Sequence, residues 1–163
     1  MAHFAELKTK VDPTGFTTDT HQVVERVVVV GNDCVPSDMH ADGETWCINF
    51  FKGGIWKQTS YNHNFRKSYA GIGMVYDPVK DKFLSPQPHA SWALDASDDW
   101  QAPVTYPTIT TYDTDKIYLI SWDEENLRWT AKDQEGVYAE DGTETTPPNN
   151  FNWDALALAW VSA

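Results

Sequence analysis

The sequence predicts a mainly β, antiparallel, hairpin-rich fold with one short helix near residues 43–52, which makes it α+β by strict count. Eight Trp, seven Tyr and seven Phe supply large, stiff side chains that pack well on sheets. Several short segments alternate between apolar and polar residues or are rich in β-branched residues. Polar segments rich in Asp, Asn and Pro separate them and are typical of turns.

The first forty residues predict one long hairpin. Residues 3–7 (HFAEL) alternate around an apolar ring, and residues 22–30 (QVVERVVVV) form a strongly β-branched strand that ends at Gly31. The segment between them carries the turn signals Asp12-Pro13 and Gly15. Four consecutive valines at 27–30 indicate burial on both faces of this strand, or cover from another element.

Residues 44–51 (ETWCINFF) carry the only plausible helix. The apolar side chains at positions 46, 47, 50 and 51 share one helical stripe. Asp42 is a candidate N-terminal cap, and Gly53-Gly54 are expected to end the helix. Because the helix has only about two turns, it needs tertiary packing to form.

A recurrent unit appears from residue 76 onward: an aromatic residue, then Asp, then a second aromatic residue seven positions after the first. It occurs at Tyr76–Phe83, Trp122–Trp129 and Trp153–Trp160, and a looser copy runs from Trp92 to Trp100. A turn placed midway sets the two rings opposite one another on paired strands. The Asp then lies near the turn, where its carboxylate can accept backbone N–H groups. The last copy has an apolar turn (DALALA), which is expected either to be helical or to pack against another chain.

The length fits one domain, or a compact body with a small appended unit. We expect a body over residues 1–107 and further hairpins over residues 108–163, or one continuous domain. Residues 132–150 are expected to form a polar surface loop that leads to the C-terminal Trp-Asp hairpin. The prolines between Pro78 and Pro148 are expected at strand ends and edges.

The charge and the apolar segments exclude several classes of function. A net charge of −12 disfavours nucleic acid and anionic membranes as partners. No signal peptide is expected, and the longest apolar run, residues 27–31, is far shorter than the ~20 residues that a transmembrane helix needs. Cys34 and Cys47 are expected to be buried, reduced thiols.

The sequence indicates no catalytic, cofactor or metal site. The five histidines show no zinc spacing; they are His3, His21, His40, His63 and His89. The acidic pairs Asp98-Asp99 and Glu124-Glu125 are better explained as turn charges than as the two carboxylates of a glycan-cleaving enzyme. Calcium binding at residues 95–99 or 113–115 stays open, although neither segment has the DxDxDG pattern.

The segment 56–76 mixes basic and aromatic residues and supplies most candidate contact residues. These are Trp56, Tyr61, Arg66, Lys67 and Tyr69, and the C-terminal rings Trp153 and Trp160 are further candidates. Such a mixture can bind a sugar or an anionic partner patch through stacking and guanidinium contacts. The alternative is a long loop that its aromatic residues hold on the core, with Arg66 paired internally to a carboxylate.

The string GIWKQTSYNHNFRKSYAGIGMVYDPVKDKFLSPQPHASWALD, followed by WQAPVTYP, resembles a small protein family of tailed phages of marine bacteria, cyanophages especially. The matching positions are Trp56–Asn62, Arg66–Gly73, Tyr76-Asp77, Phe83, Pro86, Pro88, Ser91-Trp92, Leu94, Trp100 and Ala102–Val104. The resemblance covers about Ala2–Pro107 well and the terminal hairpin more loosely. A longer first loop at residues 8–20 and extra sequence at 108–150 depart from the family pattern.

This resemblance implies a non-enzymatic virion structural protein without catalytic residues or cofactors, assembled in the host cytoplasm. A capsid decoration protein that docks on the major capsid protein is the favoured interpretation. The alternative is a tail-fibre or receptor-recognition module that binds a host surface glycan through exposed rings. Other virion proteins, and further copies of the chain in a homo-oligomer, are the expected partners, rather than nucleic acid or membrane.

Overall fold

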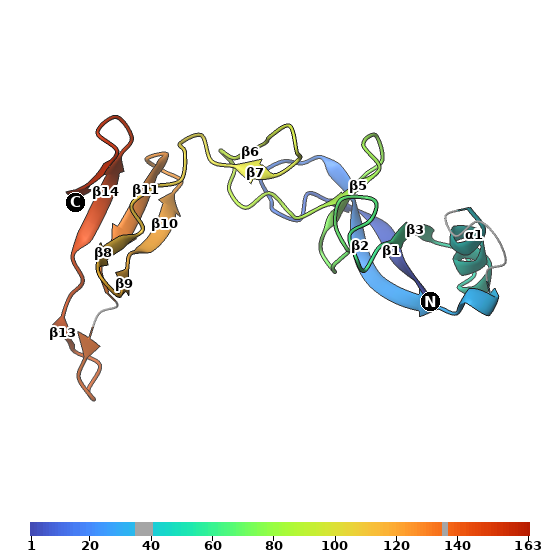
Figure 1. The fold of residues 1–163 in the computed structure, drawn as a ribbon. Helices are drawn as coiled ribbons and strands as arrows, with labels where there is room; N and C mark the ends of the chain where they lie inside the picture. The colour runs from blue at the N-terminus through green and yellow to red at the C-terminus, as the bar shows by residue number, and fades with distance from the viewer. Residues whose placement is uncertain (35–40, 135–136) are drawn as a thin grey trace. The chain divides into compact units, whose positions relative to one another are not determined.

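The computed structural model describes residues 1–34, 41–134 and 137–163, which form two compact units, Met1–Pro88 and His89–Ala163 (Figure 1). The fold is mainly β, with several antiparallel sheets and one α-helix among the described residues, as the sequence predicts. The contacts divide the chain after Pro88, whereas the sequence suggested a division after residue 107. His40 lies outside the described residues.

The first unit is built on a five-stranded antiparallel sheet in the order β3-β1-β2-β4-β5. The strands are β1 (Ala2–Val11), β2 (Thr20–Val30), β3 (Ile55–Thr59), β4 (Val75–Asp77) and β5 (Lys82–Leu84). The predicted first hairpin is confirmed, but its strands extend further, from the pair Ala2–Val30 to the pair Val11–Thr20. A β-bulge interrupts the register between Glu6 and Leu7. The longer pairing leaves a short loop where the sequence suggested a long one.

Apolar side chains cover both faces of this sheet. One face carries Phe4, Val30 and Trp56, which pack with Cys47 of the helix, and the opposite face carries a second cluster around Leu7 and Phe83. Of the four consecutive valines, three pack against these clusters, whereas Val29 is 55% exposed. The prediction of burial is therefore wrong for Val29. Since β4 pairs with β2 only at Gln22 and Val23, the far end of β2 has no strand partner on this side among the described residues.

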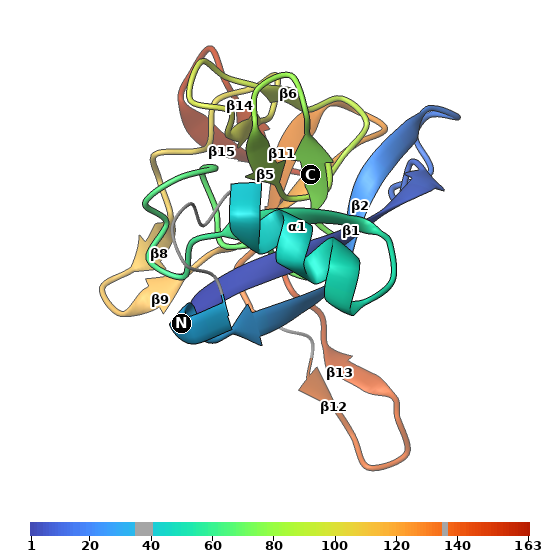
Figure 2. The ribbon, with the colours of Figure 1, turned by 90° about the vertical axis from the view of Figure 1, so that its right-hand side faces the viewer.

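The predicted helix is α1 (Ala41–Phe50), which packs on the first cluster (Figure 2). Asp42 lies inside the first turn of α1, so it is not the N-cap that the sequence suggested. At the other end, the Gly53 N–H donates to the Ile48 carbonyl at 2.8 Å, and Lys52 has a φ of 63°. This is a Schellman-type ending in which Lys52, and not a glycine, takes the left-handed position.

The predicted apolar stripe of α1 is only partly buried. Cys47 is fully buried, whereas Phe50 is 61% exposed. Gly43 lies so close to the sheet that a Cβ at this position would collide with the Phe4 ring. A glycine is thus required where the helix crosses β1. The other cysteine, Cys34, is the last residue of the short 3-10 turn η1 (Asn32–Cys34) and is exposed. The prediction of two buried thiols therefore holds only for Cys47.

The second unit contains a four-stranded antiparallel sheet in the order β10-β11-β14-β15 and several two-stranded hairpins. The sheet strands are β10 (Leu119–Asp123), β11 (Arg128–Lys132), β14 (Asn150–Asp154) and β15 (Ala159–Ser162). The hairpins are β6 (Ala93–Leu94) with β7 (Trp100–Gln101), β8 (Thr111–Asp113) with β9 (Lys116–Ile117), and β12 (Val137–Tyr138) with β13 (Glu144–Thr146). The prediction of a plain loop at 132–150 is therefore wrong, because this segment contains β12 and β13. Within the described ranges, no helix combines the length and the hydropathy that crossing a bilayer requires.

Candidate functional site

The three regular copies of the aromatic-Asp unit form hairpins with the predicted register. The paired residues are Tyr76 with Phe83, Trp122 with Trp129, and Trp153 with Trp160. Their ring centroids lie 5.2, 5.1 and 5.1 Å apart, in tilted or edge-on arrangements. Aromatic pairs attract one another at such distances and angles. The repeated spacing in the sequence is thus a repeated cross-strand ring pair.

The Asp of each copy accepts hydrogen bonds from its own turn. Asp154 Oδ1 accepts the N–H groups of Leu156 and Ala157, each at 2.9 Å. The equivalent carboxylates bond the turns at 78–81 and 124–127 in the same way. The last residue of every turn has a left-handed φ of 51° or 52°; these residues are Asp81, Leu127 and Leu158. The apolar DALALA segment therefore forms the same turn as the polar copies, and the helical interpretation is wrong.

The looser copy also forms a hairpin, but with a different pairing. Leu94 lies opposite Trp100, and Asp95 Oδ1 accepts the N–H groups of the following turn. Trp92 contacts Trp122 and Trp129 instead, with ring centroids 6.3 and 5.8 Å away. Since its rings are eight positions apart, one more than in the regular copies, they cannot be directly opposite around the same turn.

The basic and aromatic segment 56–76 does not form one open surface. Trp56 is 2% exposed in the core of the first unit. The Arg66 side chain is 7% exposed; its Nε donates to Asp81 at 2.7 Å, and its Nη1 donates to Glu44 and to the Gln58 carbonyl, each at 2.8 Å. The internal pairing of Arg66 is therefore confirmed. Trp56 and Arg66 hold the fold together and present almost no surface to a partner.

The charges of Glu44 and Asp81 change the pKa values of their neighbours Arg66 and Tyr76. Burial works against the charged form of Arg66, but the Glu44 and Asp81 carboxylates outweigh it and raise the pKa of Arg66. The hydroxyl of Tyr76 donates to Asp81, and burial together with that carboxylate raises the pKa of Tyr76. Arg66 therefore stays charged and the Tyr76 hydroxyl stays protonated near neutral pH, as expected of a structural hydrogen-bond network.

Three candidates from the same segment keep exposed or half-buried side chains. Tyr61 is 68% exposed, and Tyr69 and Lys67 are half-buried. The two tyrosine rings contact each other at 5.6 Å and contact His3 of β1 at 5.9 and 5.5 Å. This small ring cluster is the part of the predicted contact surface that remains accessible.

The C-terminal rings mainly cover the sheet of the second unit. Trp153 is 7% exposed, and the half-buried Trp160 donates its indole N–H to the Ile109 carbonyl at 2.7 Å. Trp129 likewise donates to the Val104 carbonyl at 2.9 Å. These indoles thus hold the preceding connecting segments on one face of the sheet.

Apolar side chains gather instead at one end of this sheet. Leu127 is 48% exposed, Leu156 98% and Leu158 59%. The two turns that carry them lie at the same end because β11 begins where the antiparallel β14 ends (Figure 1). We refer to these three residues as the leucine end. The sequence analysis noted the apolar turn at Leu156 as a possible contact with another chain, but it missed Leu127.

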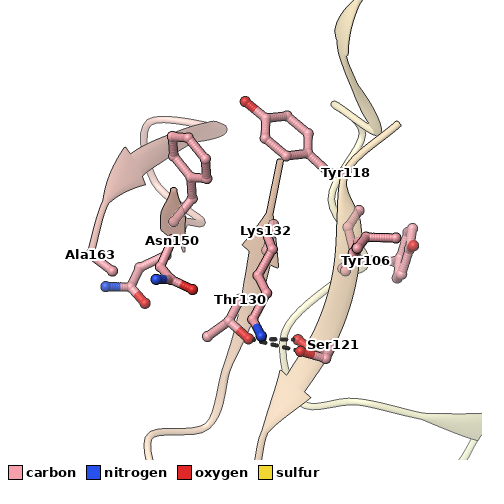
Figure 3. Close-up of a pocket in the computed structure, with 12 residues that line it drawn as sticks. Tyr106, Tyr118, Ser121, Thr130, Lys132, Asn150 and Ala163 are labelled. Carbon is pink, nitrogen blue, oxygen red and sulfur yellow. Dashed lines mark hydrogen bonds between the residues drawn. The ribbon is translucent and has the colours of Figure 1, made fainter. Parts of the chain in front are cut away.

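A second surface feature of the same sheet is an open hollow of about 680 Å³ over β10, β11 and β14 (Figure 3). It is lined by hydroxyl, amide and ammonium groups, among them Ser121, Thr130, Lys132 and Asn150, and by aromatic rings at its margin. No local motif predicts this hollow, because most of its residues come from three separate strands.

One member of each acidic pair, Glu124 and Asp98, has a structural position in its turn. The Glu124 carboxylate accepts the N–H and the hydroxyl of Ser91, both at 2.8 Å, and the indole N–H of Trp122 at 2.7 Å. These bonds lower the pKa of Glu124. Asp98 is 6% exposed at the left-handed position of its turn, with a φ of 62°. Among the described residues, no three His, Cys, Asp or Glu side chains come together as a possible metal site.

Comparison with known proteins gave no relative. No protein-family model matches the chain, and searches of curated proteins and of solved structures found no match either. The resemblance to the phage family therefore rests on the sequence motifs alone, and what it implies about function is a proposal.

Proposed function

We propose that this chain is a non-enzymatic structural protein of a phage particle, and that it decorates the capsid by docking on the major capsid protein. The sequence motifs shared with the phage family support the particle, and the leucine end supports the docking. Leu156, a large apolar side chain in the turn of a hairpin, is 98% exposed, so the described residues leave it uncovered.

The leucine end has the composition of an interface centre. Burying one leucine side chain contributes about 1.5–3 kcal/mol, so three of them supply a substantial part of a binding free energy. Polar residues of the same two hairpins, Asp123, Glu125 and Asp154, flank the leucines in the sequence. An apolar centre with a polar rim is the usual arrangement of protein–protein contacts.

The hairpins that carry the leucines are held before any partner arrives. Cross-strand ring pairs and Asp-bonded turns fix both hairpins, so little conformational entropy is lost when the leucines are covered. A preorganised contact of this kind is suited to repeated assembly on a lattice. The acidic remainder of the surface keeps neighbouring copies soluble.

The alternative function is a tail-fibre or receptor-recognition module that binds a host surface glycan. One observation favours it, namely the polar hollow on the second unit. The two functions predict different copy numbers per particle. The number of copies of a decoration protein is proportional to that of the major capsid protein, whereas the number of copies of a fibre module is not.

The test compares purified particles that carry wild-type protein, the variant L156S/L158N, or the control I117S. Asn tolerates the left-handed backbone of Leu158, and Ile117 is a 65% exposed apolar residue of the same unit outside the leucine end. Quantitative mass spectrometry should find wild type and control in proportion to the major capsid protein. We expect the variant to bind the capsid at least about tenfold more weakly, which corresponds to about 1.4 kcal/mol.

Two results would contradict the decoration function. Absence of the chain from the particles would exclude a particle protein altogether. A few copies per particle, unaffected by the leucine substitutions, would favour the fibre module instead. Circular dichroism of each purified variant checks that the loss does not come from unfolding.

A further inference from the structure

The polar face of the second sheet presents two neighbouring rows of side chains. One row runs across the strands as Ser121, Thr130 and Asn152, and the next as Leu119, Lys132 and Asn150. Side chains at these positions point to the same face, because residues two apart on a strand share a face. Figure 3 shows Ser121, Thr130, Lys132 and Asn150 of these rows at the hollow, with the Lys132 side chain running along β11 in the direction of Thr130.

Several of these groups have unused hydrogen-bonding capacity. The hydroxyls of Ser121 and Thr130 bond each other at 3.0 Å, which leaves further lone pairs free for a ligand. Within the described ranges, the Lys132 ammonium makes no ion pair and the Asn152 amide makes no side-chain hydrogen bond. The hollow thus offers donors and acceptors that the described part of the chain does not satisfy.

The charge of the hollow is opposite to that of the chain. The chain has 24 acidic residues against 12 basic ones, yet none of the twelve residues that line the hollow is acidic. Among the residues that line the hollow, Lys132 thus carries the one charged side chain. Such a site attracts an anionic group even though the whole molecule is strongly acidic.

From this arrangement we infer that the hollow binds an acidic saccharide, with a sugar carboxylate near Lys132. Paired hydroxyls and amides match the vicinal hydroxyls of a sugar, and Lys132 matches its carboxylate through a charge-assisted hydrogen bond. The volume of the hollow falls within the range of small-ligand sites. This inference does not depend on the proposed decoration function.

The experiment is an NMR titration of the full chain with two short oligosaccharides, one of hexuronic acid and one of neutral glucose. We expect the acidic oligosaccharide to shift backbone amides of β10, β11 and β14, and the neutral one to bind at least about tenfold more weakly. K132Q should weaken acidic binding about tenfold, since one charge-assisted bond is lost. The control K116Q removes the same charge from the same unit, outside the hollow, and should leave the affinity unchanged.

Three outcomes would overturn the inference. These are no binding of the acidic oligosaccharide, equal binding of both oligosaccharides, or an equal effect of K132Q and K116Q. If K132Q does not fold, the backbone amide shifts of the wild-type chain on adding the acidic oligosaccharide show where it binds. Shifts centred anywhere but on these three strands would exclude the hollow as the site. None of these outcomes bears on capsid docking, which is measured separately on particles.

Discussion

Trp153 and Trp160 lie opposite one another on β14 and β15, with ring centroids 5.1 Å apart and ring planes inclined by 65°. Trp122 and Trp129 repeat this arrangement on β10 and β11 at the same separation. Trp129 and Trp153 lie one position beyond the terminal pair of β11 and β14, which is Thr130 with Asn152. The four tryptophans thus form one row across the sheet, one from each strand, and this row makes the second unit a stiff platform.

Removing either ring of the terminal pair should destabilise the second unit. Trp153 is 7% exposed, so W153A should lower the free energy of unfolding by about 3–5 kcal/mol, and W160A by less because Trp160 is half-buried. A double-mutant cycle with leucine at both positions should give a coupling of about 0.5–1.5 kcal/mol. Urea unfolding followed by tryptophan fluorescence measures both quantities. A coupling of zero would mean that the rings do not interact.

The left-handed turn position at Leu158 should prefer glycine. A non-glycine residue with a φ of 52° costs roughly 1 kcal/mol, so L158G should keep or raise the thermal stability of the second unit. L158V should lower it, because a β-branched side chain fits this backbone poorly. L156G is the matched control in the same turn, where the φ is not left-handed and no gain is expected. Equal effects of glycine at both positions would contradict the turn geometry.

Arg66 should be irreplaceable by another cation. R66M removes the closer of the two basic partners of Glu44, whose side chain is only 15% exposed, and leaves it with Lys57 at 3.3 Å; we expect a loss of about 2–3 kcal/mol in the stability of the first unit. R66K should recover little, since an ammonium cannot reach Glu44, Asp81 and the Gln58 carbonyl together. Thermal unfolding of both variants tests this. Full recovery by lysine would show that charge alone matters at this position.

The first hairpin loop should respond to acid through Asp12. Hydrogen bonds from the Thr14 hydroxyl and N–H, and from Thr17, lower the pKa of Asp12 to about 2. Because the folded-state pKa lies below the unfolded value, the stabilisation is present above the unfolded pKa and is lost as the pH falls through the folded one. Wild type should therefore lose stability between about pH 4 and pH 2, and D12N should lose less.

NMR titration of the Asp12 carboxyl carbon checks this directly. T14V removes the hydrogen bond from the Thr14 hydroxyl, which lowers the pKa of Asp12 most, so this pKa should move up toward its ordinary value. An unchanged pKa in T14V would assign the shift to another cause.

The sequence predicted the hairpins well because their cause is local. A ring, an Asp and a second ring at a fixed spacing determine the turn, its hydrogen bonds and the register together, as at Trp122–Trp129. The looser copy failed in its pairing, since one extra residue between Trp92 and Trp100 changes which residues face each other. The end of α1 was also misjudged, because Lys52 takes a backbone conformation that composition assigns to glycine.

The contact residues were harder to predict because exposure depends on distant parts of the chain. Trp56 and Arg66 looked like a binding mixture in the sequence, yet Glu44 and Asp81 come from other elements and enclose Arg66. The leucine end and the polar hollow need the pairing of β11 with β14, which no local pattern encodes. Sequence reasoning thus found the stiff units and missed the surfaces that they create.

Electron cryomicroscopy of purified particles tests the proposed docking most directly. The account predicts repeated density for this chain over the capsid, with the turns at 124–127 and 155–158 against the major capsid protein. Leu156 should then be buried at the contact. Density in which these turns face solvent, or particles without the chain on the capsid, would contradict it.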